Sequence, residues 1–225
     1  NVFSNNSYGV LLDSSSSNFI KSNSFDSLRN AVSVSGDSNF NLIDSNQISS
    51  VETGIHIGSA YHYSIPADSS KYHNVFSNNV VSNYSDKGFY CGACYYSVFE
   101  NNSLVNELKP TAQLTDRSSG FFLDGAFNNF SSNTIENPPG NGFTLGVYSH
   151  YNNFSFNQIT GALLSGFNVD DLTGVVGTDP TPRVLASIRF SRPGRFRLSF
   201  IRPVVARALA IRVPLPVLTD RMNSG

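Results

Sequence analysis

The stretch Asn41-Leu42-Ile43-Asp44-Ser45-Asn46-Gln47-Ile48, followed closely by Gly54-Ile55-His56-Ile57, contains the two short motifs that decide the fold. The first motif reads Asn-x-(Phe/Ile)-x-x-Asn-x-apolar, and the second reads Gly-apolar-x-apolar. Each motif alternates apolar with polar residues over a few positions, which is the period of a short strand and too brief for a helix.

Both motifs recur along the chain. The first motif returns in the segments 18–25, 74–81, 128–135 and 152–159, with 97–104 carrying Ser97 in place of its first Asn and Asn1 to Asn6 giving a weaker match. The second motif begins at residues 9, 54, 88, 120, 142 and 166, and Ala31 takes the place of Gly in one further copy. The spacing is about two dozen residues, and two intervals carry insertions of roughly ten residues.

A strand this short with one apolar side cannot bury that side alone. Stacking the same segment of successive repeats in parallel, about 4.8 Å apart, satisfies the backbone hydrogen bonds and the apolar faces together. The sequence therefore predicts an all-β fold, a right-handed parallel β-helix of about seven coils. In register, six asparagines are expected to pass side-chain hydrogen bonds from coil to coil: Asn23, Asn46, Asn79, Asn102, Asn133 and Asn157. The motif glycines are expected to give the backbone the freedom that a sharp corner needs.

These motifs resemble the repeats of the right-handed parallel β-helix superfamily with the pectin-lyase-like fold, and within it the NosD-like and archaeal surface-protein branch. The resemblance covers about residues 1–171. It implies activities as different as polysaccharide lyases, hydrolases, C5-epimerases, a copper-site maturation factor, phage tailspikes and non-catalytic surface proteins. No catalytic motif of those enzymes can be matched to this chain. We expect no ordered Asp pair with Lys or Arg on neighbouring coils, and whether the chain is an enzyme stays open.

The chain divides in composition near residue 175. Residues 1–174 hold six basic and fourteen acidic residues, whereas residues 175–225 hold nine basic and two acidic ones. We therefore expect β-helix repeats over 1–174 and a basic C-terminal extension or cap over 175–225. Within the latter, residues 187–200 alternate apolar and polar on both sides of Pro193-Gly194, which predicts a β-hairpin that could cover the open end of the solenoid.

A ligand-binding face is expected on the outward side of the Gly-apolar-x-apolar strands. Their outward residues form a stripe in which His56, Tyr90 and Phe122 occupy three consecutive coils, an aromatic platform suited to sugar rings. The insertions at about 59–72, with Tyr61 and His62, and at about 105–118 lie beside these coils, and such loops commonly carry binding groups.

Two other sets of residues are candidates for chemistry. Asp124 and Asp170 each follow a motif strand two coils apart, about 10 Å by the strand spacing, which is marginal for paired glycosidase carboxylates. Asp in this place is also a common turn former. Cys91-Gly92-Ala93-Cys94 is a lone C-x-x-C, for which core packing, a small disulfide and a metal site all stay open. The sequence indicates no particular cofactor.

The remaining expectations concern partners and location. The net charge of -1 and the low charged fraction of 14% do not favour nucleic acid as a partner. The sequence contains no run of about 18 apolar residues, so we expect no transmembrane helix. Abundant Asn and Ser with several Asn-x-Ser sequons fit an extracellular or cell-surface protein. Because the chain opens inside a repeat, we expect a processed form or fragment. Two functions compete: binding or processing of a polysaccharide or cell-surface glycan, and a non-catalytic scaffold or adhesin that self-associates laterally. A NosD-like copper role is a lesser alternative.

Overall fold

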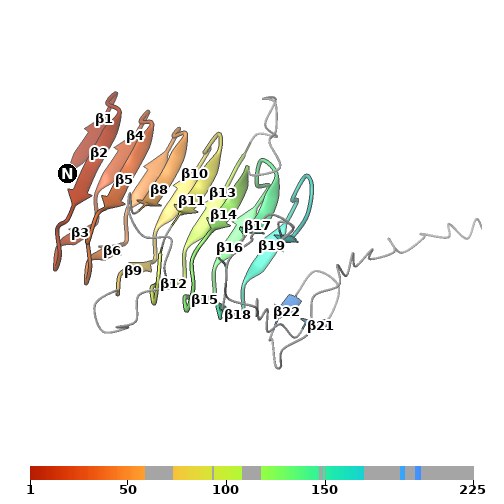
Figure 1. The fold of residues 1–225 in the computed structure, drawn as a ribbon. Coiled ribbons are helices and arrows are strands. Elements are labelled where there is room, and N and C mark those ends of the chain that lie inside the picture. Colours follow the sequence, from red (N-terminus) through yellow and green to blue (C-terminus); the bar gives the residue numbers. More distant parts are fainter. Residues whose placement is uncertain are drawn as a thin grey trace, which may run out of the picture.

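The chain winds into a parallel β-helix of seven coils (Figure 1). The computed structural model describes residues 1–58, 73–92, 94–107, 118–146, 149 and 151–169, and the backbone of two further strands, β21 and β22. Its coils lie side by side from the red N-terminal end to the cyan strands of coil 7, and every pairing between them is parallel. The predicted fold class and coil number are therefore confirmed.

Three sheets run the length of the solenoid, and we name them A, B and C. Sheet A contains β1 (Val2–Ser4), β4 (Ser24–Asp26), β7 (Gln47–Ser49), β10 (Val80–Ser82), β13 (Ser103–Val105), β16 (Thr134–Glu136) and β19 (Gln158–Thr160). Sheet B contains β2 (Tyr8–Asp13), β5 (Asn30–Ser35), β8 (Thr53–Gly58), β11 (Lys87–Cys91), β14 (Ser119–Leu123), β17 (Asn141–Leu145) and β20 (Phe167–Val169). Sheet C contains β3 (Phe19–Lys21), β6 (Leu42–Asp44), β9 (Val75–Ser77), β12 (Val98–Glu100), β15 (Asn129–Ser131) and β18 (Asn153–Ser155).

The core consists of apolar columns, one residue per coil. The middle residue of each sheet C strand points inward, and Phe76, Phe99 and Phe130 stack face to face with ring centroids 4.8 and 4.5 Å apart. A second column in sheet B, which includes Phe89 and Phe121, meets the first edge to face. Stacked and edge-to-face contacts are the arrangements that aromatic rings favour, so the repeat makes a continuous apolar interior.

The asparagine column is confirmed, and each interior member uses its whole amide. In Asn79, Oδ1 accepts hydrogen bonds from the backbone N–H of Asn46 at 3.1 Å and from the side-chain amide of Asn46 at 3.0 Å. Its own Nδ2 donates to Oδ1 of Asn102 at 3.0 Å and to the backbone carbonyl of Ile43 at 2.9 Å. The same four bonds recur from coil to coil, so a buried amide at each corner leaves no polar group unpaired.

A second asparagine column lies at the entry to sheet C. Asn18, Asn41 and Asn74 are linked in the same way, as are Asn128 and Asn152. Between the two groups stands Ser97, whose backbone N–H still donates to Oδ1 of Asn128 at 2.9 Å. The shorter side chain interrupts the amide chain, and the sheet remains paired across the interruption.

The motif glycines do not serve the purpose expected from the sequence. Among the described glycines, those with left-handed backbone are Gly36 and Gly161, which are not motif glycines. At Gly88 an added Cβ would lie 2.1 Å from a methyl carbon of Leu104 in sheet A, and Gly54 and Gly120 meet similar obstacles. The expectation of corner flexibility was wrong: at Gly54, Gly88 and Gly120 a side chain would meet sheet A, although Gly166 has open space around it and Ala31 is accommodated on coil 2.

Left-handed residues instead make the corners. Most of them are Ser or Asn, such as Ser22, Ser45 and Asn78, each directly before a member of the first asparagine column. Asn is among the few residue types that tolerate this conformation, and Ser has a similarly small polar side chain. Asn and Ser are therefore abundant in the sequence for two reasons: they tolerate the left-handed backbone of the corners, and the Asn side chains form the hydrogen-bonded columns.

The predicted C-terminal hairpin is also present in the backbone. Strands β21 (Ile188–Phe190) and β22 (Phe196–Leu198) pair antiparallel, with Arg189 opposite Arg197. The proposed covering of the solenoid end by residues 175–225 stays a prediction. Among the residues described there is no apolar helix of membrane-spanning length.

Replacing Asn102 by Ala should lower the free energy of unfolding by about 3 kcal/mol or more, because it leaves buried donors of Asn79 and the carbonyl of Phe76 without partners. Urea denaturation followed by circular dichroism measures the change. The control is Asn6→Ala, which removes an exposed side chain that donates to the carbonyl of Ser4 and should change stability by less than about 0.5 kcal/mol. Equal effects of the two substitutions would refute the structural role of the column.

Replacing the buried Tyr84 by Phe should have the opposite effect on stability from replacing Asn102 by Ala. Its ring is buried, its hydroxyl has no hydrogen-bond partner in the described chain, and burial raises the pKa of the phenol well above its usual value. Tyr84→Phe should therefore keep or raise the unfolding free energy, by up to about 1 kcal/mol, since an unsatisfied hydroxyl is removed without loss of volume. Thermal unfolding of both proteins checks this, and a clear loss of stability would mean that the hydroxyl is bonded in the folded protein.

Candidate functional site

The outward stripe expected on sheet B is present in register. Ser33, His56, Tyr90 and Phe122 pair directly across β5, β8, β11 and β14. The ring of His56 stacks on Tyr90 with centroids 4.7 Å apart, and Tyr90 stacks on Phe122 at 5.4 Å, both with nearly parallel planes. The faces of these rings are therefore largely turned toward one another.

Glycines make room for this stack. A Cβ at Gly92 would lie 2.5 Å from the ring and hydroxyl of Tyr90, and one at Gly58 would lie 2.9 Å from the ring of His56. Each ring thus lies over the residue two positions later in its own chain segment: His56 over Gly58 and Tyr90 over Gly92. Gly58 and Gly92 are the reason that two large rings fit on adjacent coils.

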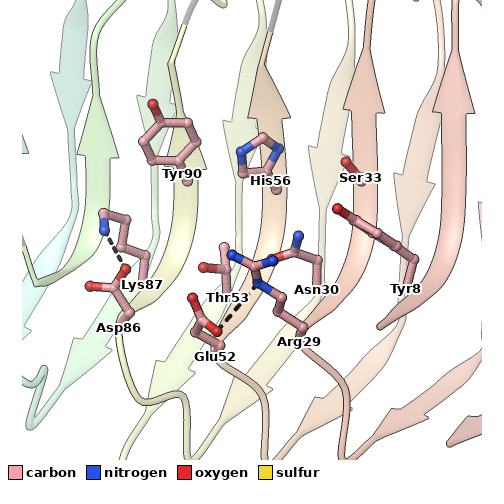
Figure 2. A pocket seen from close by; sticks show the side chains of 10 residues that line it. All are labelled: Tyr8, Arg29, Asn30, Ser33, Glu52, Thr53, His56, Asp86, Lys87 and Tyr90. Carbon is pink, nitrogen blue, oxygen red and sulfur yellow. Dashed lines mark hydrogen bonds and ion pairs between the residues drawn. The ribbon is translucent and has the colours of Figure 1, made fainter. Parts of the chain in front are cut away.

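A groove of about 270 Å³ opens beside the stack on coils 1 to 4, and Figure 2 shows His56 and Tyr90 above a row of charged side chains. Its volume is near the lower limit for small-molecule pockets. The lining consists of Tyr8, Arg29, Asn30, Ser33, Glu52, Thr53, His56, Asp86, Lys87 and Tyr90.

The charges occupy successive coils at the position just before each sheet B strand. Arg29, Glu52 and Asp86 follow one another there, as the backbone bonds from Thr53 to Arg29 and from Asp86 to Glu52 show. The Nε atom of Arg29 lies 3.5 Å from a carboxylate oxygen of Glu52, and Lys87 pairs with the adjacent Asp86. The Arg29–Glu52 pair joins neighbouring coils, whereas Lys87 and Asp86 belong to the same coil.

Lys87 joins the charged row to the rings. Its side chain is only 12% exposed, and its ammonium lies 5.7 Å from the centroid of Tyr90 and 5.8 Å from that of Phe122. Cation–π attraction and the bond to Asp86 hold it in place. Burial, with the cations of Lys87 and Arg29 nearby, lowers the pKa of His56 below its ordinary value of 6.5. This shift favours the neutral form of His56.

The other candidate residues fall in different places. Phe122 is buried and does not line the groove, while Tyr61 and His62 lie outside the described residues. Asp124 directly follows β14, and its carboxyl group is 3.1 Å from where a Cβ of Gly146 would be. Asp170 lies outside the described residues, so the proposed carboxylate pair stays a prediction.

Cys91 and Cys94 form a disulfide, with Cα atoms 5.5 Å apart, and both residues are buried. Of the three readings of the C-x-x-C motif, the structure shows the disulfide, here placed within the core. A bonded sulfur is not a thiolate ligand, so metal binding by this pair would require its reduction. In the described part of the chain, no three His, Cys, Asp or Glu side chains gather closely enough to hold a metal ion.

The charged row could have been found from the sequence. It stands two residues before each motif glycine, in Arg29-Asn30-Ala31, Glu52-Thr53-Gly54 and Asp86-Lys87-Gly88. The alignment of the motifs already placed these residues in one column. Their pairing into Arg29–Glu52 and Lys87–Asp86 depends on side-chain conformation, which the spacing alone does not give.

The titration of His56 tests this geometry. The pKa of His56 in the folded protein should lie below 6.5, and Lys87→Gln should raise it, because one of the two nearby cations is removed. Since the unfolded chain binds this proton more readily, the contribution of His56 makes the fold less stable as pH falls through 6.5. NMR titration of the imidazole measures both effects. Lys21→Gln, on sheet C, is the control and should leave the pKa unchanged; an equal shift in both variants would contradict the arrangement.

Comparison with known proteins supports the architecture. A sequence model described as the right-handed beta helix region matches residues 1–159. No curated protein and no solved structure shows significant similarity to the chain. The match covers more than half of the sequence and agrees with the three parallel sheets, so the chain belongs to the right-handed β-helix family.

Proposed function

We propose that this chain is an extracellular or cell-surface β-helix domain that binds a polysaccharide in the groove on sheet B. The observation that carries the proposal is the groove itself, lined by polar and charged side chains from four consecutive coils beside the His56–Tyr90 stack. Binding grooves with a wall of rings and a few convergent polar groups are typical of specific ligand sites.

The repetition of the groove fits a linear, repeating ligand. Coils 2 to 4 each contribute a residue to the charged row and a residue at the first position of the strand, about 4.8 Å from the next, and coil 1 contributes Tyr8. Arg29 and Lys87 offer donors, Glu52 offers acceptors, and Asn30 and Thr53 offer both. A chain of sugar hydroxyls, which donate and accept at every unit, can use such an alternating set.

The three rings do not form the flat platform for a sugar that the sequence led us to expect. Because His56, Tyr90 and Phe122 stack on one another, the edges of His56 and Tyr90 border the groove. The face of His56 that looks away from Tyr90 lies toward the small side chain of Ser33 (Figure 2). A sugar ring is therefore proposed to contact His56 over Ser33, on the coil where the stack of large residues is interrupted.

Binding is favoured over processing by the state of the carboxylates. Glu52 and Asp86 stand on adjacent coils, a spacing that glycosidase chemistry could use. Each of them is engaged by a cation, Glu52 by Arg29 and Asp86 by Lys87. Ion-paired carboxylates serve well as fixed hydrogen-bond acceptors, which is the part that we assign to them. The alternative function, a non-catalytic scaffold that self-associates, would use sheet C, which forms a surface separate from the groove.

An array of neutral and uronate-containing oligosaccharides tests the proposal. The wild-type chain should bind at least one glycan class, and Arg29→Ala should weaken that binding about tenfold or more, because a charge-assisted hydrogen bond to the ligand is lost. Lys21→Ala is a matched control, since Lys21 is an exposed, ion-paired cation on sheet C with 60% of its side chain accessible against 63% for Arg29. No binding to any glycan, or equal losses in the two variants, would contradict the proposal.

A further inference from the structure

Sheet C carries an outward apolar column that sheet A lacks. The first residues of its strands on coils 1 to 4 are Phe19, Leu42, Val75 and Val98, and Phe19 is 77% exposed. The corresponding residues of sheet A are mostly polar: Val2, Ser24, Gln47, Val80, Ser103, Thr134 and Gln158. Both sheets have three-residue strands with an inward middle residue, so the strand geometry does not account for the difference.

Aromatic side chains extend this surface at the corner that leads into sheet C. Phe40, Phe127 and Tyr151 stand there directly before members of the second asparagine column, and Tyr96 stands before Ser97; all four have left-handed backbone. Tyr96 stacks on Phe127 at 4.9 Å, and Phe127 on Tyr151 at 4.8 Å. The left-handed region costs a bulky residue about 1–2 kcal/mol. At the equivalent corner before the first asparagine column, Ser and Asn predominate, so the aromatic choice is an unfavourable one locally.

On sheet C, Lys21 on coil 1 and Glu100 on coil 4 carry opposite charges at the same position of their strands. The third residues of its strands form the column Lys21, Asp44, Ser77 and Glu100 on coils 1 to 4. Asp44 is already satisfied within the chain: burial opposes its charge, but hydrogen bonds from Asn78 and Ser77 and the Lys21 ammonium at 2.9 Å lower its pKa strongly. Glu100 has no ion-pair or side-chain hydrogen-bond partner among the residues described.

We propose that sheet C is the contact surface for a second copy of this chain, related by a twofold axis parallel to the sheet C strands and midway between coils 2 and 3. This operation places coil 1 opposite coil 4 and coil 2 opposite coil 3. Phe19 then faces Val98 of the second copy, and Leu42 faces Val75 of the second copy. Lys21 faces Glu100 of the second copy, and the reverse contact forms at the other end, as an isologous interface requires.

The size of the surface sets the strength of the association. The operation overlaps coils 1 to 4, so the strands in contact measure roughly 10 Å across by about 14 Å along four strands, and Phe40 and Tyr96 at the corner widen the surface. This is below the area of a standard stable interface, so the dimer is weak and depends on concentration. The surface lies on a different sheet from the groove on sheet B, and the two proposals are independent.

Sedimentation velocity of the full chain over a range of concentrations tests the proposal. The wild type should form a dimer reversibly. Lys21→Glu and Glu100→Lys should each weaken dimerisation about tenfold or more, because like charges then face each other, and the double variant should restore it. The double variant still lacks the Lys21–Asp44 pair, so restoration can come only from contact between copies; three coils separate the two positions within one chain.

Matched substitutions separate this contact from loss of folding. Val75→Lys on sheet C should abolish dimerisation, whereas Val80→Lys at the equivalent outward position of sheet A should leave it intact, with circular dichroism confirming that both fold. A chain that stays monomeric at its highest soluble concentration overturns the proposal. So does a charge-swapped double variant that remains as weakened as its parents.

Discussion

The structure depends on an amide chain in which every interior asparagine of the first column satisfies both of its donors and both acceptor positions. The spacing of parallel strands brings each Oδ1 within reach of the backbone and side chain of the preceding coil, and each Nδ2 within reach of the next. A single buried asparagine would be costly. A column of them is fully paired, and it fixes the register in which all other side chains stack.

Once the register is fixed, every position of the repeat becomes a column with its own chemistry. Inward columns form the crossed phenylalanine stacks of the core. Outward columns form surfaces whose character changes along the axis, such as the stripe in which Ser33 interrupts a series of larger residues. The groove on sheet B and the apolar surface on sheet C are two results of one constraint, since both are made of residues recurring once per coil.

The fold could be read from the sequence because its signal is repetition. The recurrence of Asn46, Asn79 and Asn102 predicted the hydrogen-bonded column, and the Gly-apolar-x-apolar strands predicted the stripe through His56 and Tyr90. The role of the glycines was not predictable from one strand, because the obstacle at Gly88 is Leu104 in another sheet. The charged row of Arg29, Glu52 and Asp86 was missed because it lies outside both motifs. The burial of Phe122 depends on its surroundings in three dimensions, which a repeat pattern does not contain.

The two proposed contact surfaces lie on different sheets, and the asparagine column holds these sheets in a constant relation. Proton exchange of the side-chain amides of Asn46, Asn79 and Asn102, followed by NMR, measures this column most directly. If the amides are bonded as described, their protons should exchange as slowly as the backbone amides of the adjoining strands, and far more slowly than those of the exposed Asn6. Rapid exchange of the column amides, at the rate of Asn6, would contradict the account.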